Sequence, residues 1–251
     1  MGASDMSYRV AVPSTGRTDI LPDRTLATLR RLGVSDDAVD VFVAPHEVSA
    51  YTRARRGWSF KPRILEGAQG LRGQRRAIRV AYPPGARVLC VDDDLGDLYQ
   101  LVEGRLAPVG ELDEVALVGF RHAEDRGLHL WGTYPVRNAF FMRPTITYDL
   151  RFIAGGFYGL VVDHDPGLDE QLDLKDDYER TLLYYHRDGG VVRLNYIHAG
   201  CWIYRGAGGI SDIRTSESEA ASVQALMERW PRNVKLNRRR KGPYPQVTLR
   251  C

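Results

Sequence analysis

Three consecutive aspartates, Asp92, Asp93 and Asp94, have the residue type and spacing of a metal site. Side chains alternate along an extended chain, so Asp92 and Asp94 can face one way while Asp93 faces the other. Clustered carboxylates repel one another unless a cation lies among them, and Mg²⁺ and Mn²⁺ suit such oxygen ligands. We therefore predict a divalent metal at Asp92 and Asp94, with phosphate oxygens filling its open positions. The alternative is a solvated turn whose aspartates cap a helix.

The apolar run that precedes the aspartates predicts where they lie in the fold. Residues 88–91 have the composition of a strand buried on both faces of a parallel sheet, and ligands bind at the carboxyl ends of such strands. Residues 8–12 and 39–43 are two more candidate strands, with a helical pattern at 23–32 between them. This is the spacing of a βαβ unit, so we predict an α/β fold.

Two glycine-containing segments have compositions that suit phosphate binding. Residues 13–17, Pro-Ser-Thr-Gly-Arg, follow the first strand, although an ordinary connection to a helix would look the same. Residues 67–76 combine glycines with arginines at the start of a predicted helix, 72–82, so that Arg72, Arg75 or Arg76 could pair with a diphosphate. The Gly-Lys-Ser/Thr ending of a Walker A loop is missing.

Two acidic residues and one histidine are further candidates. Asp176 and Asp177 begin a predicted helix that extends to about residue 186; they could cap it or present a catalytic base. His198 follows a predicted strand at 191–197 and could complete an Asp-Asp-His metal set, although a single histidine more often packs or caps.

The patterns elsewhere predict the remaining organisation. A predicted strand at 152–163 is interrupted by Gly155 and Gly156, where a ligand could approach or a β-bulge could form. The other expectations are a surface excursion at 46–60, a strand or a short helix and strand at 112–120, a charged loop at 122–126, a segment tending to a strand at 138–142, and a capping box at 216–219 before a helix ending at Trp230.

The distribution of charge indicates a polyanionic partner. The net charge is +3, yet residues 229–251 carry eight Lys or Arg and no acid, and residues 53–79 carry nine against the single Glu66. The three cysteines have neither an even count nor metal-ligand spacing. No apolar stretch is long enough to span a membrane and no signal peptide is visible, so we expect a cytoplasmic protein.

The order of these motifs resembles that of metal-dependent glycosyltransferases of the GT-A fold. Within that class the sequence looks most like the phage DNA 5-hydroxymethylcytosine glycosyltransferases, often found beside TET-type dioxygenases. The resemblance covers residues 8–249 and rests on residues 13–17, 70–76, 91–94, 155–157, 175–179 and 208–209. It implies a Rossmann-like α/β domain (residues 1–228) with a mixed, mostly parallel sheet flanked by helices, and a basic C-terminal extension (residues 229–251).

The resemblance also implies a UDP-sugar donor, with UDP-glucose expected, whose diphosphate Mn²⁺ or Mg²⁺ links to Asp92 and Asp94. The residues expected to contact this donor are Pro13, Ser14, Thr15, Arg17, Gly70, Arg72, Arg76, Asp92, Asp93, Gly155 and Gly156. Residues 175–177 line up with a Glu-Asp pair of inverting GT-A enzymes, although the first acid here is Asp. Asp177 is our candidate base for the acceptor hydroxyl, with Asp176 second.

The implied acceptor is the hydroxymethyl group of 5-hydroxymethylcytosine in DNA, with the base flipped out of the duplex. The expected DNA contacts are Arg55, Arg56, Lys61, Arg238, Arg239, Arg240 and Lys241, with Trp58 and Phe60 able to wedge or stack. We expect no membrane and no obligate protein partner, and location in the cytoplasm of a phage-infected bacterial host. Alternatives are a GT-A enzyme with a saccharide or other non-DNA acceptor, a nucleotidyltransferase, and a non-catalytic nucleic-acid-binding protein.

Overall fold

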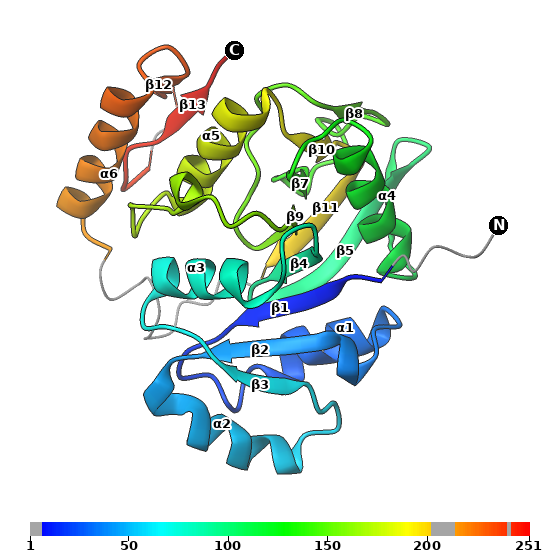
Figure 1. The fold of residues 1–251 in the computed structure, drawn as a ribbon. Coiled ribbons are helices and arrows are strands. Elements are labelled where there is room, and N and C mark those ends of the chain that lie inside the picture. Colours follow the sequence, from blue (N-terminus) through cyan, green and yellow to red (C-terminus); the bar gives the residue numbers. More distant parts are fainter. Residues whose placement is uncertain (1–6, 202–213, 240–241) are drawn as a thin grey trace.

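The computed structural model describes residues 7–201, 214–239 and 242–251. Within these ranges, an eight-stranded sheet crosses the molecule with helices packed on it (Figure 1). In spatial order its strands are β3 (Arg63–Glu66), β2 (Val39–Val43), β1 (Arg9–Pro13), β4 (Arg87–Val91), β9 (Phe157–Val161), β7 (Leu130–Thr133), β10 (Val192–Leu194) and β8 (Ile146–Thr147). Strands β9 and β8 run antiparallel to their neighbours and the others pair in parallel, which confirms the predicted mixed, mostly parallel α/β sheet.

The helices cover both faces of this sheet. The main helices are η1 (Pro22–Leu26), α1 (Ala27–Arg31), α2 (Val48–Ala54), α3 (Leu71–Ala81), α4 (Asp113–Glu124), α5 (Asp176–Asp188) and α6 (Ser216–Arg229). Shorter 3₁₀ turns are η2 (Asp36–Ala38), η3 (Pro45–Glu47), η4 (Arg55–Gly57) and η5 (Pro166–Leu168). None of the helices in the described ranges is long and apolar enough to cross a membrane.

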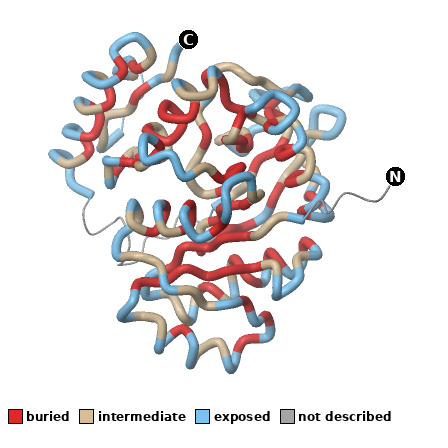
Figure 2. The backbone as a smooth tube through the Cα atoms, viewed as in Figure 1, coloured by how far each residue is buried: buried red, intermediate tan, exposed pale blue. Residues whose placement is uncertain are grey.

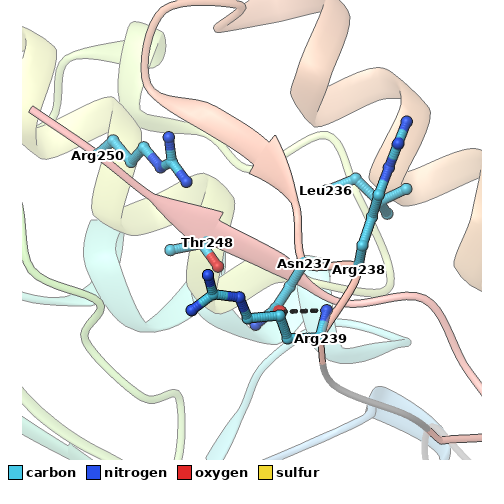
Figure 3. Close-up of a pocket in the computed structure, with 6 residues that line it drawn as sticks. All are labelled: Leu236, Asn237, Arg238, Arg239, Thr248 and Arg250. Atoms are coloured by element: carbon cyan, nitrogen blue, oxygen red, sulfur yellow. Dashed lines mark hydrogen bonds between the residues drawn. The ribbon is translucent and has the colours of Figure 1, made fainter.

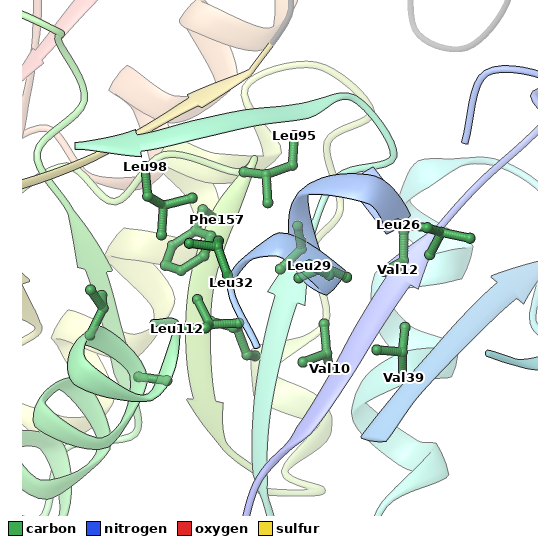
Figure 4. Close-up of a cluster of buried hydrophobic side chains, with 14 of the residues drawn as sticks. Val10, Val12, Leu26, Leu29, Leu32, Val39, Leu95, Leu98, Leu112 and Phe157 are labelled. Carbon is green, nitrogen blue, oxygen red and sulfur yellow. The ribbon is translucent and has the colours of Figure 1, made fainter. Parts of the chain in front are cut away.

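The core has two layers because side chains alternate across each strand. In β1, Val10 and Val12 join the cluster that contains Leu29 of α1 (Figure 4), whereas Ala11 joins the cluster on the opposite face with Ile78 of α3. The strands β1, β2 and β4 are therefore almost completely buried (Figure 2). Their carboxyl ends form a rigid edge from which the functional loops emerge.

A second, three-stranded sheet begins directly after the aspartates, and the sequence analysis did not predict it. It consists of β5 (Leu95–Val102), β6 (Arg105–Pro108) and β11 (Ile197–Cys201), in the order β11-β5-β6. Glu103 and Gly104 form the β5–β6 turn with positive φ values of 48° and 78°. Such a two-residue turn fits the twist of a hairpin, but Glu-Gly is a weaker sequence signal for it than Asn-Gly.

Several predicted elements were wrong. Residues 113–124 form one helix, α4, in place of the predicted strand, or short helix and strand, and charged loop. The helix forms because Val115, Ala116 and Phe120 place an apolar stripe on the sheet. The strand at 152–163 starts only at Phe157. Residues 138–142 form a turn, and the 191–197 strand divides into β10 and β11.

The predicted surface excursion at 46–60 was wrong at its aromatic residues: most of the segment is exposed or half-buried, but Tyr51, Trp58 and Phe60 are buried. Residues 45–57 form η3, α2 and η4, and Trp58 and Phe60 are buried, with relative exposures of 7% and 3%. Trp58 packs edge-on against Tyr51 of α2, with ring centroids 6.4 Å apart. Both aromatic rings close the core at one end of the sheet, so they are not available to wedge into DNA.

The C-terminal segment packs on the domain. Strands β12 (Val234–Leu236) and β13 (Val247–Leu249) pair as an antiparallel hairpin, and Val234 and Val247 are buried in the core cluster of α5 and α6. The capping box of α6 lies one residue earlier than predicted: Thr215 is the N-cap, and its side chain and that of Ser218 cap each other's backbone. The extension is thus a basic, ordered hairpin over its described residues.

Candidate active site

The aspartates leave the sheet at the end of β4 in a fixed turn. Thr25, fully buried in η1, donates a hydrogen bond to the Asp92 carbonyl (2.8 Å) and accepts one from the Leu95 backbone N–H (2.9 Å). The Asp92 backbone N–H donates to the Gly156 carbonyl (3.0 Å). Nothing in the sequence pattern singled out Thr25, yet it determines how the aspartates are presented.

Each aspartate has a different environment. Asp93 is buried and is bound by the Ser14 hydroxyl (2.7 Å) and by the guanidinium of Arg17. Burial raises the pKa of Asp93, and the charge of Arg17 opposes this rise. Asp92 Oδ1 accepts a hydrogen bond from Arg75 (2.8 Å).

Asp94 is the least compensated of the three. Among the described residues, its Oδ1 atom is buried and has no hydrogen-bond partner. Burial, followed by the charges of Asp92 and Asp93, raises the pKa of Asp94 to about 7. An unpaired buried carboxylate oxygen beside two other carboxylates is suited to a cation, so Asp92 and Asp94 fit a hard divalent metal.

His198 does not join this group. It lies inside β11 opposite Tyr99 of β5, and its Nδ1 is 2.9 Å from the Tyr134 carbonyl oxygen. Burial lowers the pKa of His198. Within the described ranges no three His, Cys, Asp or Glu side chains come together as a metal-binding group, so the predicted Asp-Asp-His set is not assembled.

The loop after β1 is held against Asp93. Pro13 is the last residue of β1, and Thr15 is exposed beyond it. The Tyr51 hydroxyl lies 2.8 Å from Ser14 Oγ and accepts the Arg17 backbone N–H (2.9 Å). The structure therefore brings Ser14 and Arg17 to the aspartates, and Tyr51 of α2, which the sequence analysis did not identify, organises them.

Three of the four arginines of α3, namely Arg72, Arg75 and Arg76, face different ways. Gly70, with a φ of 76°, precedes the helix. Arg72 donates to the Gln171 carbonyl (2.8 Å), and Arg76 pairs with Asp169 (3.2 Å), so both contact the 169–173 segment. Arg75 points inward to Asp92 and the Gly155 carbonyl (3.0 Å), and its Nε and Nη1 atoms lack hydrogen-bond partners among the described residues. Arg75 is thus the arginine of this helix that reaches the aspartates.

Gly155 and Gly156 join the aspartates to α5. A Cβ atom built on Gly156 would lie 3.5 Å from Asp92 Oδ2 and 2.4 Å from Cys201 Sγ. One built on Gly155 would lie 3.5 Å from Asp177 Cβ and 3.6 Å from Arg75 Nη2. The backbone here passes between the two acidic groups, which are therefore neighbours in one site.

Asp176 and Asp177 have different partners. Asp176 Oδ2 lies 3.6 Å from Arg180 Nη1 and 3.9 Å from Arg75 Nε, so two buried arginines compensate its charge. Asp177 Oδ1 accepts only the adjacent Tyr178 backbone N–H (2.9 Å) among its hydrogen bonds in the described structure. Burial, and then the charge of Asp176, raises the pKa of Asp177 to about 7. The raised pKa suits Asp177 to accept a proton near neutral pH.

The backbone before α5 is strained. Lys175 has a φ of 61°, in the left-handed region that side chains other than glycine rarely adopt. Its ammonium is 2.9 Å from Glu219 Oε2 of α6, and Thr181 accepts the Ile153 backbone N–H (3.1 Å). These contacts join the first half of α5 to α6 and to the backbone that leads into the glycine segment, Gly155 and Gly156. Strain of this kind is common at functional sites.

The predicted DNA-contacting residues fall into two separate groups. Arg55, Arg56 and Lys61 lie between α2 and β3, and Arg55 is bound to the Lys61 carbonyl (2.7 Å). Arg238 and Arg239 lie on the C-terminal hairpin, which is far from β3 in Figure 1. Arg240 and Lys241 lie outside the described residues, as do Gly208 and Gly209.

The hairpin residues line a basic hollow of about 680 Å³ (Figure 3). It is formed by Leu236, Asn237, Arg238, Arg239, Thr248 and Arg250. A second hollow of about 210 Å³ shares Thr248 and is otherwise formed by Leu150, Arg151, Phe152, Tyr178, Arg193, Val247 and Leu249. Among the described residues, no acidic side chain lines either hollow. Tyr178, the residue after Asp177, lines the second hollow.

The sequence matches no family model and no curated protein. Solved structures share its fold. S. aureus TarS 1–349 has a TM-score of 0.51 and 12% identity over 88% of this chain and 65% of that one. Glucosyl-3-phosphoglycerate synthase from Mycobacterium tuberculosis, in complex with Mn²⁺, UDP and glucosyl-3-phosphoglycerate, has a TM-score of 0.51 and 10% identity, over 97% and 86% of the two chains.

GalNAc-T7, with UDP, GalNAc and Mn²⁺, also has a TM-score of 0.51, with 11% identity over 88% of this chain and 48% of that one. The chain thus spans less than two thirds of TarS 1–349 and about half of GalNAc-T7. These likenesses show that the chain has the GT-A type of α/β fold.

Proposed function

We propose that this chain is a metal-dependent glycosyltransferase that uses a UDP-sugar, with UDP-glucose as the expected donor. The observation that carries the proposal is the placement of Asp94 and Arg75 on either side of Asp92. Among the described residues, the buried Oδ1 of Asp94 and the buried Nε and Nη1 of Arg75 have no hydrogen-bond partner. A cation would compensate the first, and phosphate oxygens the second. Two solved structures of the same fold hold Mn²⁺ and UDP.

Each group of residues in the site is assigned one role in the transfer reaction. Asp92 and Asp94 would hold Mn²⁺ or Mg²⁺, which when bound stabilises negative charge on the departing diphosphate. Arg75 donates to the same diphosphate. Pro13, Ser14, Thr15, Arg17 and Asp93 form the nucleoside side of the site. Arg72 and Arg76 contact the 169–173 segment, so we assign them to that segment and not to the phosphates.

Asp177 accepts the proton of the acceptor hydroxyl. The acceptor oxygen bonds to the anomeric carbon, the bond from that carbon to the diphosphate breaks, and UDP leaves. A pKa of about 7 keeps Asp177 basic enough to take the proton at neutral pH. Asp176 pairs with Arg180 and Arg75, and its charge contributes to the raised pKa of Asp177.

For the acceptor we propose 5-hydroxymethylcytosine in DNA. The two hollows are lined by Arg151, Arg193, Arg238, Arg239 and Arg250 and, among the described residues, by no acid, although Asp149 pairs with Arg151 (2.8 Å) beside them. Such a surface favours a phosphodiester backbone over a neutral saccharide. Arg55, Arg56 and Lys61 lie at the other end of the molecule and would serve only a long duplex.

Mass spectrometry tests the activity and the acceptor together. Duplex DNA with 5-hydroxymethylcytosine, matched DNA with unmodified cytosine, and simple saccharides are incubated with a panel of nucleotide sugars and Mn²⁺. We expect one hexose added per 5-hydroxymethylcytosine, none on cytosine, and none with Asp94→Ala. Transfer to saccharides alone would support glycosyltransferase activity but contradict the DNA acceptor. No transfer to any acceptor would contradict both the activity and the acceptor.

A further inference from the structure

The loop between β7 and β8 presents two aromatic rings to solvent. Phe140 and Phe141 are 75% and 54% exposed, and Phe140 is the most exposed of the large hydrophobic residues that the structure describes. The two rings lie edge to face with centroids 5.0 Å apart. Val136, at 51% exposure, extends the same loop. Apolar rings exposed side by side indicate a contact surface.

The loop is built to hold the rings outward. Asn138 Oδ1 accepts the Phe140 backbone N–H (3.0 Å), and the Asn138 carbonyl accepts the Phe141 backbone N–H (3.1 Å). Arg143 Nη1 donates to the Phe140 carbonyl (2.8 Å), and the neighbouring Met142 is buried at 1% exposure. The buried Met142 side chain and these hydrogen bonds therefore hold the turn, and with it the two exposed rings, in one arrangement.

The loop emerges at the same sheet edge as the aspartates. Tyr158 of β9 pairs with Cys90 of β4 on one side and with Gly132 of β7 on the other. Asp92 and Tyr134 each follow two residues later, directly after the ends of β4 and β7, which run in the same direction. Two strand spacings separate them, or about 10 Å.

The charge and shape of the loop fit a nucleic acid. Residues 134–148 contain Arg137 and Arg143 and no acid. The loop returns through β8, which pairs with Arg193 of β10, a residue of the second basic hollow. Phe has no polar atom to hydrogen-bond a sugar, whereas apolar wedges flanked by arginines are inserted between base steps by proteins that deform DNA.

We propose that Phe140 and Phe141 form a wedge that unstacks the duplex next to the target nucleotide while the basic hollows hold its backbone. This inference rests on the proposed DNA acceptor. It gives the chain a physical means of delivering a flipped base to the sheet edge, a task that the buried Trp58 and Phe60 cannot perform.

The test uses a duplex in which 2-aminopurine lies next to 5-hydroxymethylcytosine. The fluorescence of 2-aminopurine rises when this base unstacks. We compare wild type, the double variant Phe140→Ser with Phe141→Ser, the double Trp variant at the same positions, and Val102→Ser as a control for loss of an exposed apolar side chain (45% exposed). UDP binding and thermal unfolding confirm that each variant is intact.

We expect the Ser variant to lose the fluorescence rise and about tenfold or more in duplex affinity, with UDP binding unchanged. The Trp variant should restore both properties, and Val102→Ser should match wild type. Two results would overturn the wedge without contradicting the proposed function. In the first, wild type transfers sugar but does not unstack the duplex; in the second, the Ser variant unstacks the duplex as wild type does. Loss of binding to anionic vesicles instead of DNA in the Ser variant would also overturn it. No duplex binding by wild type would overturn the DNA acceptor as well.

Discussion

Arg75 Nη2 lies 2.8 Å from Asp92 Oδ1, so a buried arginine of α3 is joined to the first aspartate after β4. The same nitrogen donates to the Gly155 carbonyl (3.0 Å). Because unpaired buried donors are costly, the remaining N–H groups of Arg75 are well placed to bind a ligand that carries oxygens. This pair therefore links the glycine segment, the aspartates and the proposed diphosphate position.

Replacing Arg75 should weaken nucleotide binding selectively. Arg75→Lys keeps the charge but loses the planar array of donors, so we expect the Kd for UDP to rise about tenfold or more. Arg76→Lys is the matched control, because its side chain is 66% exposed and pairs with Asp169. Isothermal titration calorimetry measures both variants. Equal affinities in the two variants would show that Arg75 does not contact the nucleotide.

The two adjacent glycines should differ in their tolerance of alanine. At Gly155 the new Cβ would be no closer than 3.4 Å to any atom, whereas at Gly156 it would lie 2.4 Å from Cys201 Sγ. Gly155→Ala should thus retain most transfer activity, and Gly156→Ala should lose most of it by forcing Cys201, which lies beside Asp92, to shift. Steady-state transfer assays, with circular dichroism as a fold control, decide this. Similar activities for both variants would argue against the packed arrangement.

Asp177 should affect turnover more than donor binding. Asp177→Asn removes the proton acceptor, so we expect kcat to fall about 10²–10⁴-fold while UDP affinity stays the same. In wild type, kcat should rise with pH through about 7 as Asp177 loses its proton. The variant's residual rate should lack this rise. A pH profile shared by both proteins would assign the titration to another group.

The raised pKa of Asp177 also predicts how stability varies with pH. The pKa of Asp177 is 3.8 in the unfolded chain and about 7 in the folded protein. Between about pH 4 and about pH 7, therefore, the folded protein keeps a proton on Asp177 that the unfolded chain has released. This group therefore makes stability fall as pH rises from about 4 to about 7. Asp177→Asn should exceed wild type by about 1–3 kcal/mol at pH 8 and match it near pH 4. Urea unfolding at the two pH values measures the difference; a constant gap would contradict it.

The sequence allowed prediction of the site wherever a buried apolar strand ends in polar residues. Residues 88–94 and 8–17 showed this pattern clearly, so the carboxyl ends of β4 and β1, with Asp92 and Ser14, could be placed at one edge before the structure was known. The Gly155–Gly156 pair likewise indicated either a close approach or a β-bulge; in the structure it lies before β9, in close contact with its neighbours. These features depend on local periodicity and on the alternation of side chains, which the sequence displays directly.

The remaining features depend on long-range packing. Arg75 is on the buried face of α3 with Ile78, three residues later, and only the acids it meets make its burial acceptable. Trp58 and Phe60 were assigned to the surface because arginines surround them, but the rings enter the core while the charges remain outside. Thr25 and Tyr51 act through contacts with residues distant in the sequence, which no local pattern shows.

The most direct test of the central claim is calorimetric titration of UDP into wild type and Asp94→Ala, each with Mn²⁺ and with chelator. Asp94→Ala should remain folded, since its removal relieves an uncompensated buried carboxylate. We predict that wild type binds UDP at least about tenfold more tightly with Mn²⁺ than without it, and that Asp94→Ala shows no such metal effect. UDP binding that does not depend on the metal in wild type, or an unchanged metal effect in Asp94→Ala, would contradict a nucleotide-sugar site at these aspartates.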